Sequence, residues 1–474
     1  MKPFLCALTI LLLAAAAPGG QQLPAPPATL DPATVNKYIA ATVQARAIVG
    51  LSVAIVRDGV VRLAGAYGKS SLATGAPVTT NTLFAVGSVT KQFTAACILL
   101  LAQEGALSVN NNVARYYPGL TRARDISLLD LMNHVSGYAD YYPLDFVDSR
   151  MEAPIAADDL IAQYAGRALD FEPGSEWSYS NTGYVILGRV VEKAGGQPLG
   201  EFMRRRILQP LGMEHSVFGP AVAGQDFAQG YTRFALGPPE PARTEARGWL
   251  EGAGGLSTTA LDLVKWDMAL IQGRVLNDSS YALMTTPRRL SRGRAREYGC
   301  GIGVAIISGT IVLRHEGQVS GFTAWNIIVP ATRSAVVILS NCEESDALGH
   351  LKDVLANLIM PGPPWIPSIR GPDAGAAVME FFRALQAGRV DRSRLGEEFS
   401  RYLSEDKVRG AAARLRSFRA PLRAEVRRRS ERGGMEVAEV RLVCKKGVLS
   451  ALLYRTPDGR IQECLFQPGE AIDR

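Results

Sequence analysis

The sequence predicts an α+β fold: an antiparallel sheet flanked by helices with a large, mainly helical insertion, followed by a small C-terminal α+β domain. Short runs of β-branched and apolar residues lie near both ends of the first 360 residues, whereas residues 106–290 have mainly helix and loop patterns. A proline-rich stretch then precedes helical patterns and four strand-like runs. Strands drawn from both ends of a region indicate one sheet that is interrupted by a helical insertion.

The start of the chain has the pattern of a secretory signal peptide. A lysine at the second position precedes an apolar run over residues 4–17, and small residues follow over 18–20. The run is too short for a transmembrane helix, and no later segment is apolar over the length that a bilayer requires. We therefore expect residues 1–20 to be a signal peptide, residues 21–30 to be a linker, and the mature chain to be periplasmic or secreted, without a stable membrane span.

In the large domain the sequence predicts a helix and a β-hairpin before the insertion, and strands and a last helix after it. A helical pattern over residues 33–46 precedes two strand-like runs, 51–56 and 60–64, and Asp58-Gly59 between these runs is a strong hairpin signal. After the insertion, strands are predicted over 299–307, 310–315, 322–329 and 334–339, and a helix over 345–359.

A second, smaller domain follows a semi-rigid linker. The proline-rich segment 361–373 separates a large domain, residues 31–360, from a basic α+β accessory domain, residues 374–474. In the accessory domain helices are predicted over 376–387 and 405–417, and strands over 422–429, 435–443, 447–455 and 461–467.

The net charge of +7 lies in the accessory domain, which holds 21 basic and 14 acidic residues, while the rest of the chain holds 31 of each. The run Arg427-Arg428-Arg429 is either a patch for polyanions or a solvated strand edge. The second interpretation fits an exported protein better, and no nucleic-acid partner is expected.

Ser88-Val89-Thr90-Lys91 stands where an apolar segment gives way to a helical pattern. Residues three apart share a helix face, so the Ser88 hydroxyl and the Lys91 ammonium can approach each other, as an activated nucleophile requires. A serine at a helix start is also a common N-cap. Ser404 has the same spacing to Lys407, so the spacing alone does not separate the two interpretations.

Two further stretches of the large domain carry chemically useful side chains. Tyr179-Ser180-Asn181 offers a phenol, a hydroxyl and an amide in a loop bounded by glycine and proline. His315-Glu316-Gly317 stands at the end of a predicted strand, where the glycine allows a close approach to the backbone. His134 is expected to shape a loop, and Tyr138, Tyr141 and Tyr142 either line a cleft mouth or are surface aromatics.

In order and approximate spacing, these three motifs resemble those of the serine β-lactamase-like family, in its class C and DD-peptidase branch. The sequence segments 131–137, 207–213 and 254–262 also resemble that family, and the resemblance covers roughly residues 31–360. The resemblance implies a β-lactamase/transpeptidase-like fold and an acyl-enzyme formed on Ser88. Ser404, which has no companion motifs, is then a helix cap.

The resemblance also implies the roles of the other site residues, and it implies no metal or cofactor. Lys91 and Tyr179 would share the role of base, with the ammonium lowering the pKa of the phenol. Asn181 would hold Lys91 and the substrate amide. The substrate-binding residues would include His315, Glu316, Gly317 and Gln318, with an oxyanion hole formed by the backbone N–H groups of Ser88 and Gln318.

The third motif departs from the Lys-Thr-Gly of the β-lactamases. His315 in place of lysine is compatible with peptidases and esterases of the family, and Glu316 would repel a substrate carboxylate if it faced the cleft. We therefore predict an exported serine hydrolase that acts on a small amide or ester, with efficient β-lactam hydrolysis disfavoured. The alternative is a non-hydrolytic penicillin-binding or peptidoglycan-fragment sensor. The predicted partner is a small-molecule or peptide substrate.

Five cysteines remain beyond the signal peptide, and an odd number argues against a fully paired framework. Cys97 is expected to be a buried apolar residue. Cys444 and Cys464 are expected on neighbouring strands, where they could pair.

Overall fold

A computed structural model of the chain divides into two compact units, Met1–Met360 and Pro361–Arg474. The predicted signal peptide, residues 1–20, lies outside the described residues. The structure describes residues 24–142, 147–219, 226–233, 237–291, 296–307, 309–343, 346–361 and 367–468.

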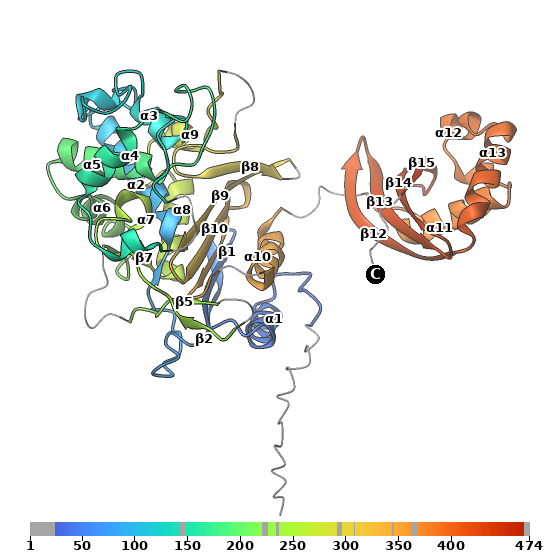
Figure 1. Cartoon of the computed structure of the whole chain (residues 1–474). Coiled ribbons are helices and arrows are strands. Elements are labelled where there is room, and N and C mark those ends of the chain that lie inside the picture. The colour runs from blue at the N-terminus through green and yellow to red at the C-terminus, as the bar shows by residue number, and fades with distance from the viewer. Residues whose placement is uncertain are drawn as a thin grey trace, which may run out of the picture. The chain divides into compact units, whose positions relative to one another are not determined.

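A six-stranded sheet forms the centre of the first unit, in the order β2-β1-β11-β10-β9-β8, with antiparallel neighbours throughout (Figure 1). β1 pairs with β11, so the first and the last strands of the unit meet inside the sheet. This arrangement confirms the prediction of one sheet built from both ends of the region. The strands are β1 (Gly50–Arg57), β2 (Val60–Gly68), β8 (Gly303–Ile307), β9 (Thr310–Val319), β10 (Phe322–Val329) and β11 (Ser334–Ser340).

The β1–β2 hairpin turns at the predicted dipeptide. Asp58 and Gly59 have φ values of 56° and 79°, as the tight hairpin turns that match strand twist require. The third motif, by contrast, does not end a strand as predicted, because β9 continues beyond Gly317 to Val319.

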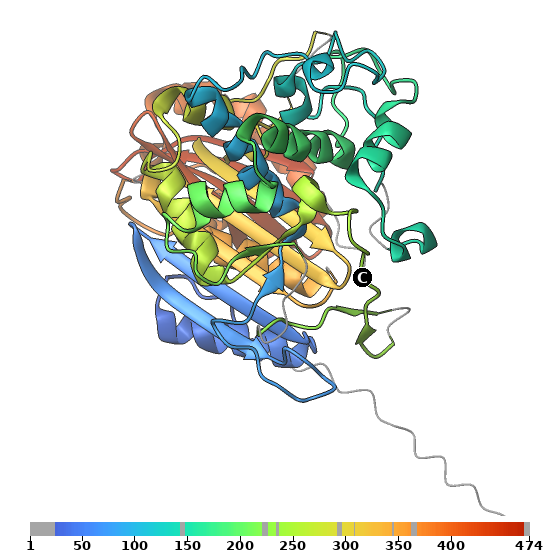
Figure 2. The same cartoon turned by 90° about the vertical axis from the view of Figure 1, so that its left-hand side faces the viewer.

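Helices cover both faces of the sheet (Figures 1 and 2). On β1, Val53 and Ile55 pack in a cluster with α1 (Pro32–Ala45) and α10 (Asp346–Ile359), whereas Ala54 belongs to the larger core on the opposite face. This alternation follows from the two-residue period of a strand.

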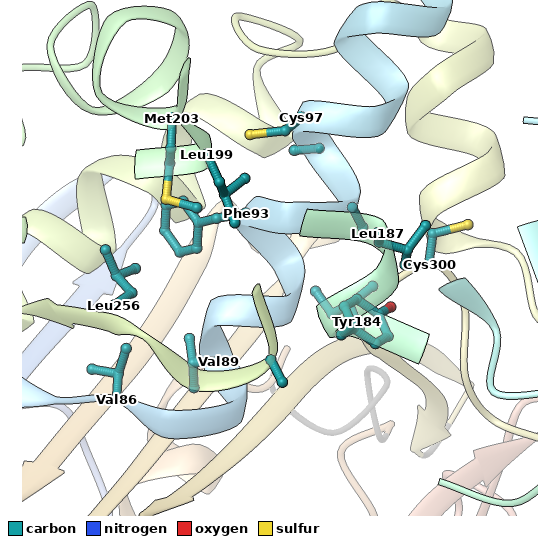
Figure 3. Packing of buried hydrophobic residues seen from close by; sticks show 14 of the residues in the cluster. Val86, Val89, Phe93, Cys97, Tyr184, Leu187, Leu199, Met203, Leu256 and Cys300 are labelled. Carbon is teal, nitrogen blue, oxygen red and sulfur yellow. The ribbon is translucent and has the colours of Figure 1, made fainter. Parts of the chain in front are cut away.

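The large core surrounds α2 (Thr90–Gln103), which is buried from Thr90 to Leu101 (Figure 3). Its first turn carries buried polar side chains, whereas the residues from Ala95 to Leu101 are all apolar. Phe93 and Cys97 lie along this helix among residues of the insertion, and Cys97 is a buried apolar residue, as predicted.

The insertion between the early and late strands is mainly helical, as predicted. Its helices are α3 (Leu128–Met132), α4 (Ala157–Ala165), α5 (Asn181–Gly195), α6 (Leu199–Met203), α7 (Glu251–Gly254), α8 (Ala260–Ile271) and α9 (Asp278–Thr285). The short strand β3 (Phe84–Ala85) precedes α2. The insertion itself contains the short strands β4 (Val217–Phe218), β5 (Tyr231–Thr232), β6 (Glu240–Pro241) and β7 (Leu256–Thr258).

In its described residues, the second unit is a four-stranded antiparallel sheet in the order β12-β13-β14-β15 with three α-helices. One helix, α12, has no counterpart among the predicted elements. The elements are α11 (Ala374–Gln386), α12 (Glu397–Tyr402), α13 (Glu405–Leu415), β12 (Pro421–Arg432), β13 (Met435–Cys444), β14 (Val448–Arg455) and β15 (Ile461–Pro468).

The expectation that Cys444 and Cys464 lie on neighbouring strands is wrong. Cys444 ends β13 and Cys464 lies on β15, with β14 between them, and both thiols are free.

The arginine run lies on β12, an edge strand, where Arg427 pairs with Glu425 and Arg429 with Glu436. Among the described residues, no helix combines the length and the apolar character needed to cross a bilayer.

Candidate active site

Ser88 lies in the short 3₁₀ turn Gly87–Val89 that leads into α2, and its side chain is only half-buried. Neither the turn nor the helix is capped by a side chain, so Ser88 does not act as an N-cap. Ser404, the residue with the same spacing to lysine, accepts a hydrogen bond from the Lys407 amide at 3.3 Å and caps α13. The structure thus separates two sites that spacing alone leaves equivalent.

Lys91 is fully buried and donates three hydrogen bonds from Nζ. Its acceptors are Ser88 Oγ at 2.9 Å, Asn181 Oδ1 at 2.7 Å and the Ala253 carbonyl oxygen at 2.8 Å. Burial lowers the Lys91 pKa to about 7, against the opposing effect of the negative charge of Asp140. Lys91 can therefore lose its proton near neutral pH while it stays in contact with Ser88.

Tyr179 lies beside the same pair. Lys91 Nζ is 4.8 Å from the centre of its ring, and Ser88 is the polar side chain that acts most directly on its hydroxyl. The expectation of a lowered phenol pKa is not met. Burial raises the Tyr179 pKa, and the charges of Asp140 and Glu316 add to that rise, whereas the hydrogen bond with Ser88 lowers the pKa. A neutral phenol is therefore suited to donate a proton, which leaves Lys91 as the group suited to accept one.

Asn181, the first residue of α5, is fixed by Asp140, a residue that the sequence analysis did not single out. Asp140 accepts hydrogen bonds from the Asn181 backbone N–H at 3.0 Å and from Asn181 Nδ2 at 3.2 Å. The amide group is thereby oriented so that its oxygen faces Lys91. Burial raises the pKa of Asp140.

β9 passes very close to the turn that carries Ser88. A Cβ atom added to Gly317 would lie 1.9 Å from the Val86 carbonyl oxygen, and one added to Gly87 would lie 2.9 Å from the Gln318 amide nitrogen. Glycine at both positions permits this approach. It brings the backbone N–H of Gln318 near that of Ser88, as an oxyanion hole requires.

His315 is buried and hydrogen-bonded at both ring nitrogens. Its Nδ1 lies 2.6 Å from the Glu316 carbonyl oxygen and its Nε2 lies 2.8 Å from the Tyr298 hydroxyl. Burial lowers the His315 pKa to about 3, helped by the charge of Lys91, so the imidazole is neutral at physiological pH. In that state Nδ1–H donates to the carbonyl and Nε2 accepts from Tyr298. Tyr298 is a second residue that the sequence analysis missed.

The predicted structural role of His134 agrees with its surroundings. His134 is buried, its Nδ1 accepts a hydrogen bond from the Ser180 amide at 3.1 Å, and its ring centre lies 4.3 Å from that of Tyr179. The tyrosines that follow it have different roles. Tyr138 is buried and donates to the Thr121 carbonyl oxygen, whereas Tyr141 and Tyr142 line a cavity.

That cavity has a volume of about 1200 Å³ and contains Ser88, Tyr179, Asn181, His315, Glu316 and Gln318 in its wall. The predicted site residues thus come together on one cavity, apart from Lys91, which lies behind Ser88, and Gly317, which packs on the turn. Within the described part of the chain, no group of histidine, cysteine and acidic side chains could hold a metal ion.

A cavity-facing serine hydrogen-bonded to a buried lysine, with a phenol and two backbone N–H groups close by, defines the class of sites that activate a serine nucleophile. The sequence profile of the Beta-lactamase family matches residues 35–359. The chain belongs to that family.

Individual relatives agree with this assignment. A penicillin-binding protein of Bacillus subtilis strain 168 is 30% identical over 295 residues, which is 59% of this chain and 65% of that protein. A D-aminopeptidase of Gluconobacter oxydans is 26% identical over 324 residues, or 66% of this chain and 60% of the relative. The match thus spans less than two thirds of either relative.

A solved structure also shares the fold. The D-amino acid amidase of Ochrobactrum anthropi SV3, in complex with L-phenylalanine amide, has a TM-score of 0.60 and 25% sequence identity. The match covers 69% of this chain and 97% of the amidase. This likeness agrees with the predicted β-lactamase/transpeptidase-like fold.

Proposed function

We propose that this chain is a serine hydrolase that cleaves small amides through an acyl-enzyme on Ser88. The observation that carries the proposal is the buried Lys91, whose Nζ lies 2.9 Å from Ser88 Oγ. An amine with a pKa of about 7 is half deprotonated near neutral pH, where general-base catalysis is most effective.

In the acylation step, Lys91 Nζ takes the proton of Ser88 while Ser88 Oγ bonds to the substrate carbonyl carbon. The backbone N–H groups of Ser88 and Gln318 stabilise the negative charge on the carbonyl oxygen. As the bond from carbon to nitrogen breaks, the leaving nitrogen takes a proton from Tyr179. Tyr179 recovers its proton from the Lys91 ammonium, whose Nζ lies 4.8 Å from the centre of the Tyr179 ring.

Deacylation uses the same groups in reverse. A water molecule in the position of the leaving amine gives a proton to Lys91 by way of Tyr179 and attacks the acyl carbon. The bond between that carbon and Ser88 Oγ breaks, and the oxygen receives the proton from Lys91. An ester would follow the same two steps with an alcohol as the leaving group.

The substrate is an amide without a carboxylate at the third motif. His315 is neutral and Glu316 is an acidic residue, so neither side chain provides a cation for a β-lactam carboxylate or a free C-terminus. The relatives named D-aminopeptidase and D-amino acid amidase support amides of D-amino acids as the first substrates to test. The apolar run over residues 4–17 supports export, with action outside the cytoplasm.

Hydrolysis of D-alanine p-nitroanilide and of p-nitrophenyl acetate, measured beside labelling with a fluorescent penicillin, tests the proposal. Ser88→Ala should lower kcat/KM by about 10³-fold or more and abolish labelling. Ser404→Ala is the matched control, because that serine has the same spacing to lysine but caps a helix, and activity should be unchanged. Persistent penicillin labelling without turnover of the anilide or the ester would instead support the sensor.

A further inference from the structure

Glu316 places a carboxylate in the wall of the cavity without a neutralising partner. Its side chain is exposed and, among the described residues, forms no ion pair. Of the cations elsewhere in the cavity wall, Arg314 lies 3.9 Å from Glu297 and Lys352 lies 3.4 Å from Asp353, whereas Arg296 lies over the ring of Trp177. The negative charge of Glu316 is thus available to a ligand.

The Glu316 carboxylate is held in place. Trp325, which is directly opposite on β10, is buried and donates a hydrogen bond from Nε1 to Glu316 Oε1 at 3.1 Å. This bond fixes one oxygen, and among the described residues no hydrogen bond is formed by Oε2. A charged group that is positioned in this way loses little freedom when it binds a ligand, as a recognition site requires.

Glu316 is also close enough to the reacting groups to affect them. Burial is the main cause of the raised Tyr179 pKa, and the charge of Glu316 contributes to it. Tyr179 is the group that protonates the leaving nitrogen in the proposed mechanism. Its ring centre lies 6.5 Å from that of His315, the residue before Glu316 on β9, and all three residues line one cavity, which places Glu316 near the leaving group. The edge of β9 is open there, because β8 pairs only with residues 310–314.

We propose that Glu316 binds an ammonium group on the leaving-group part of the substrate, so that the chain prefers amides and peptides with a cationic leaving amine. This inference rests on the proposed hydrolysis at Ser88 and goes beyond it by naming the charge of the substrate. A carboxylate at the same place would be repelled by the like charge of Glu316.

Three N-acetyl-D-alanyl amides test this preference. Their leaving amines, of nearly equal length, are ethylenediamine, propylamine and β-alanine, which present a cation, a methyl group and a carboxylate. For the unmodified protein we expect kcat/KM to fall in that order, by about tenfold at each step, as one charge-assisted contact would give. The difference should shrink as the salt concentration rises. Equal rates on the three amides would overturn the proposal.

Glu316→Gln removes the charge and keeps an oxygen that can accept from Trp325. The ratio of kcat/KM between the cationic and anionic amides should then fall to within about threefold. Asp353→Asn is the matched control, since Asp353 lines the same cavity but pairs with Lys352, and it should keep the ratio of the unmodified protein. A ratio unchanged by Glu316→Gln would contradict the proposal.

Binding separates this inference from the proposed reaction. The three amides can be titrated calorimetrically into the Ser88→Ala protein, which retains Glu316 but lacks the nucleophile. An affinity that falls from the cationic to the anionic amide supports recognition by Glu316, whether or not the unmodified protein hydrolyses the amides. Absence of hydrolysis by the unmodified protein would reject only the proposed reaction. Equal affinities would reject the recognition by Glu316.

Discussion

Lys91 and Ser88 differ in exposure although their side chains are hydrogen-bonded at 2.9 Å: Lys91 has no exposed surface, whereas Ser88 reaches the cavity. Burial of Lys91 removes water from its amine, which allows the amine to lose its proton near neutral pH. Burial also keeps the amine out of contact with bulk water and with substrate. In the proposed reaction, Ser88 rather than Lys91 therefore contacts the substrate carbonyl.

Replacement of Lys91 by methionine should remove the base and preserve the apolar part of the side chain. We expect kcat/KM on p-nitrophenyl acetate to fall by about 10²- to 10⁴-fold, as is typical for the loss of a general base. Lys407→Met is the control, because Lys407 follows a capping serine at the same spacing. Activity within a few fold of the unmodified protein would show that another group deprotonates Ser88.

The pH profile should reveal the ionisation of Lys91. Because the neutral amine is the active form, kcat/KM should rise with pH through an apparent pKa near 7. The negative charge of Asp140 stabilises the ammonium and raises the Lys91 pKa. Asp140→Asn should therefore move this limb of the profile to lower pH. A shift to higher pH would contradict the assignment of the limb to Lys91.

Much of the site follows from three short motifs, because each combines a reactive side chain with a local signal such as a helix start or a glycine. Asp140 and Tyr298 have no such signal. Asp140 lies in a loop without periodicity and acts through Asn181, 41 positions later, and Tyr298 acts through His315, 17 positions later. Partners of this kind are set by tertiary packing, which one sequence does not show.

Local patterns also explain the errors in the predicted fold. The glycine at Gly317 suggests that the strand ends there. Glycine is also needed inside a strand that lies close to another backbone, because it has no side chain, and Gly317 is such a case. The placement of Cys444 and Cys464 on neighbouring strands is wrong because the order of strands in a sheet is not visible in their separate patterns.

A methyl group at Gly317 should disturb the oxyanion hole. In Gly317→Ala the new Cβ would lie 1.9 Å from the Val86 carbonyl oxygen, so β9 must move away from the turn that carries Ser88. We expect a loss of at least about tenfold in kcat and a lower melting temperature, since overpacking typically costs about 1–3 kcal/mol. Gly119→Ala, where an added Cβ meets no atom within 4 Å, should change neither quantity. Normal activity of Gly317→Ala would argue against Gln318 as an oxyanion donor.

Loss of the Tyr298 hydroxyl should leave His315 Nε2 buried without a donor. Tyr298→Phe is expected to lower the free energy of unfolding by about 1–3 kcal/mol, the usual cost of an unsatisfied buried polar group. Chemical denaturation measures this change. Tyr402→Phe, at an exposed tyrosine of the second unit, is the control and should have no effect. Equal stability of the two variants would show that water replaces the lost donor.

The second unit contains a buried ion pair whose loss should destabilise that unit specifically. Glu436 has no exposed surface, and its Oε2 lies 2.5 Å from Nη2 of Arg455, which is 2% exposed, while Oε1 lies 2.6 Å from Arg429 Nη2. In Glu436→Gln the Arg455 charge would remain buried without a counter-charge. Such a loss typically costs about 3–5 kcal/mol, so the unfolding of the second unit should move to lower denaturant concentration.

Glu425→Gln provides the comparison on the neighbouring strand. Glu425 pairs with Arg423, Arg427 and Arg441, but it is half-exposed, and its loss should cost less than about 1 kcal/mol. Because the two units have separate cores, ester hydrolysis by Glu436→Gln should persist at denaturant concentrations that unfold the second unit. Simultaneous loss of hydrolysis and of the second unit would show that the catalytic unit depends on its partner for stability.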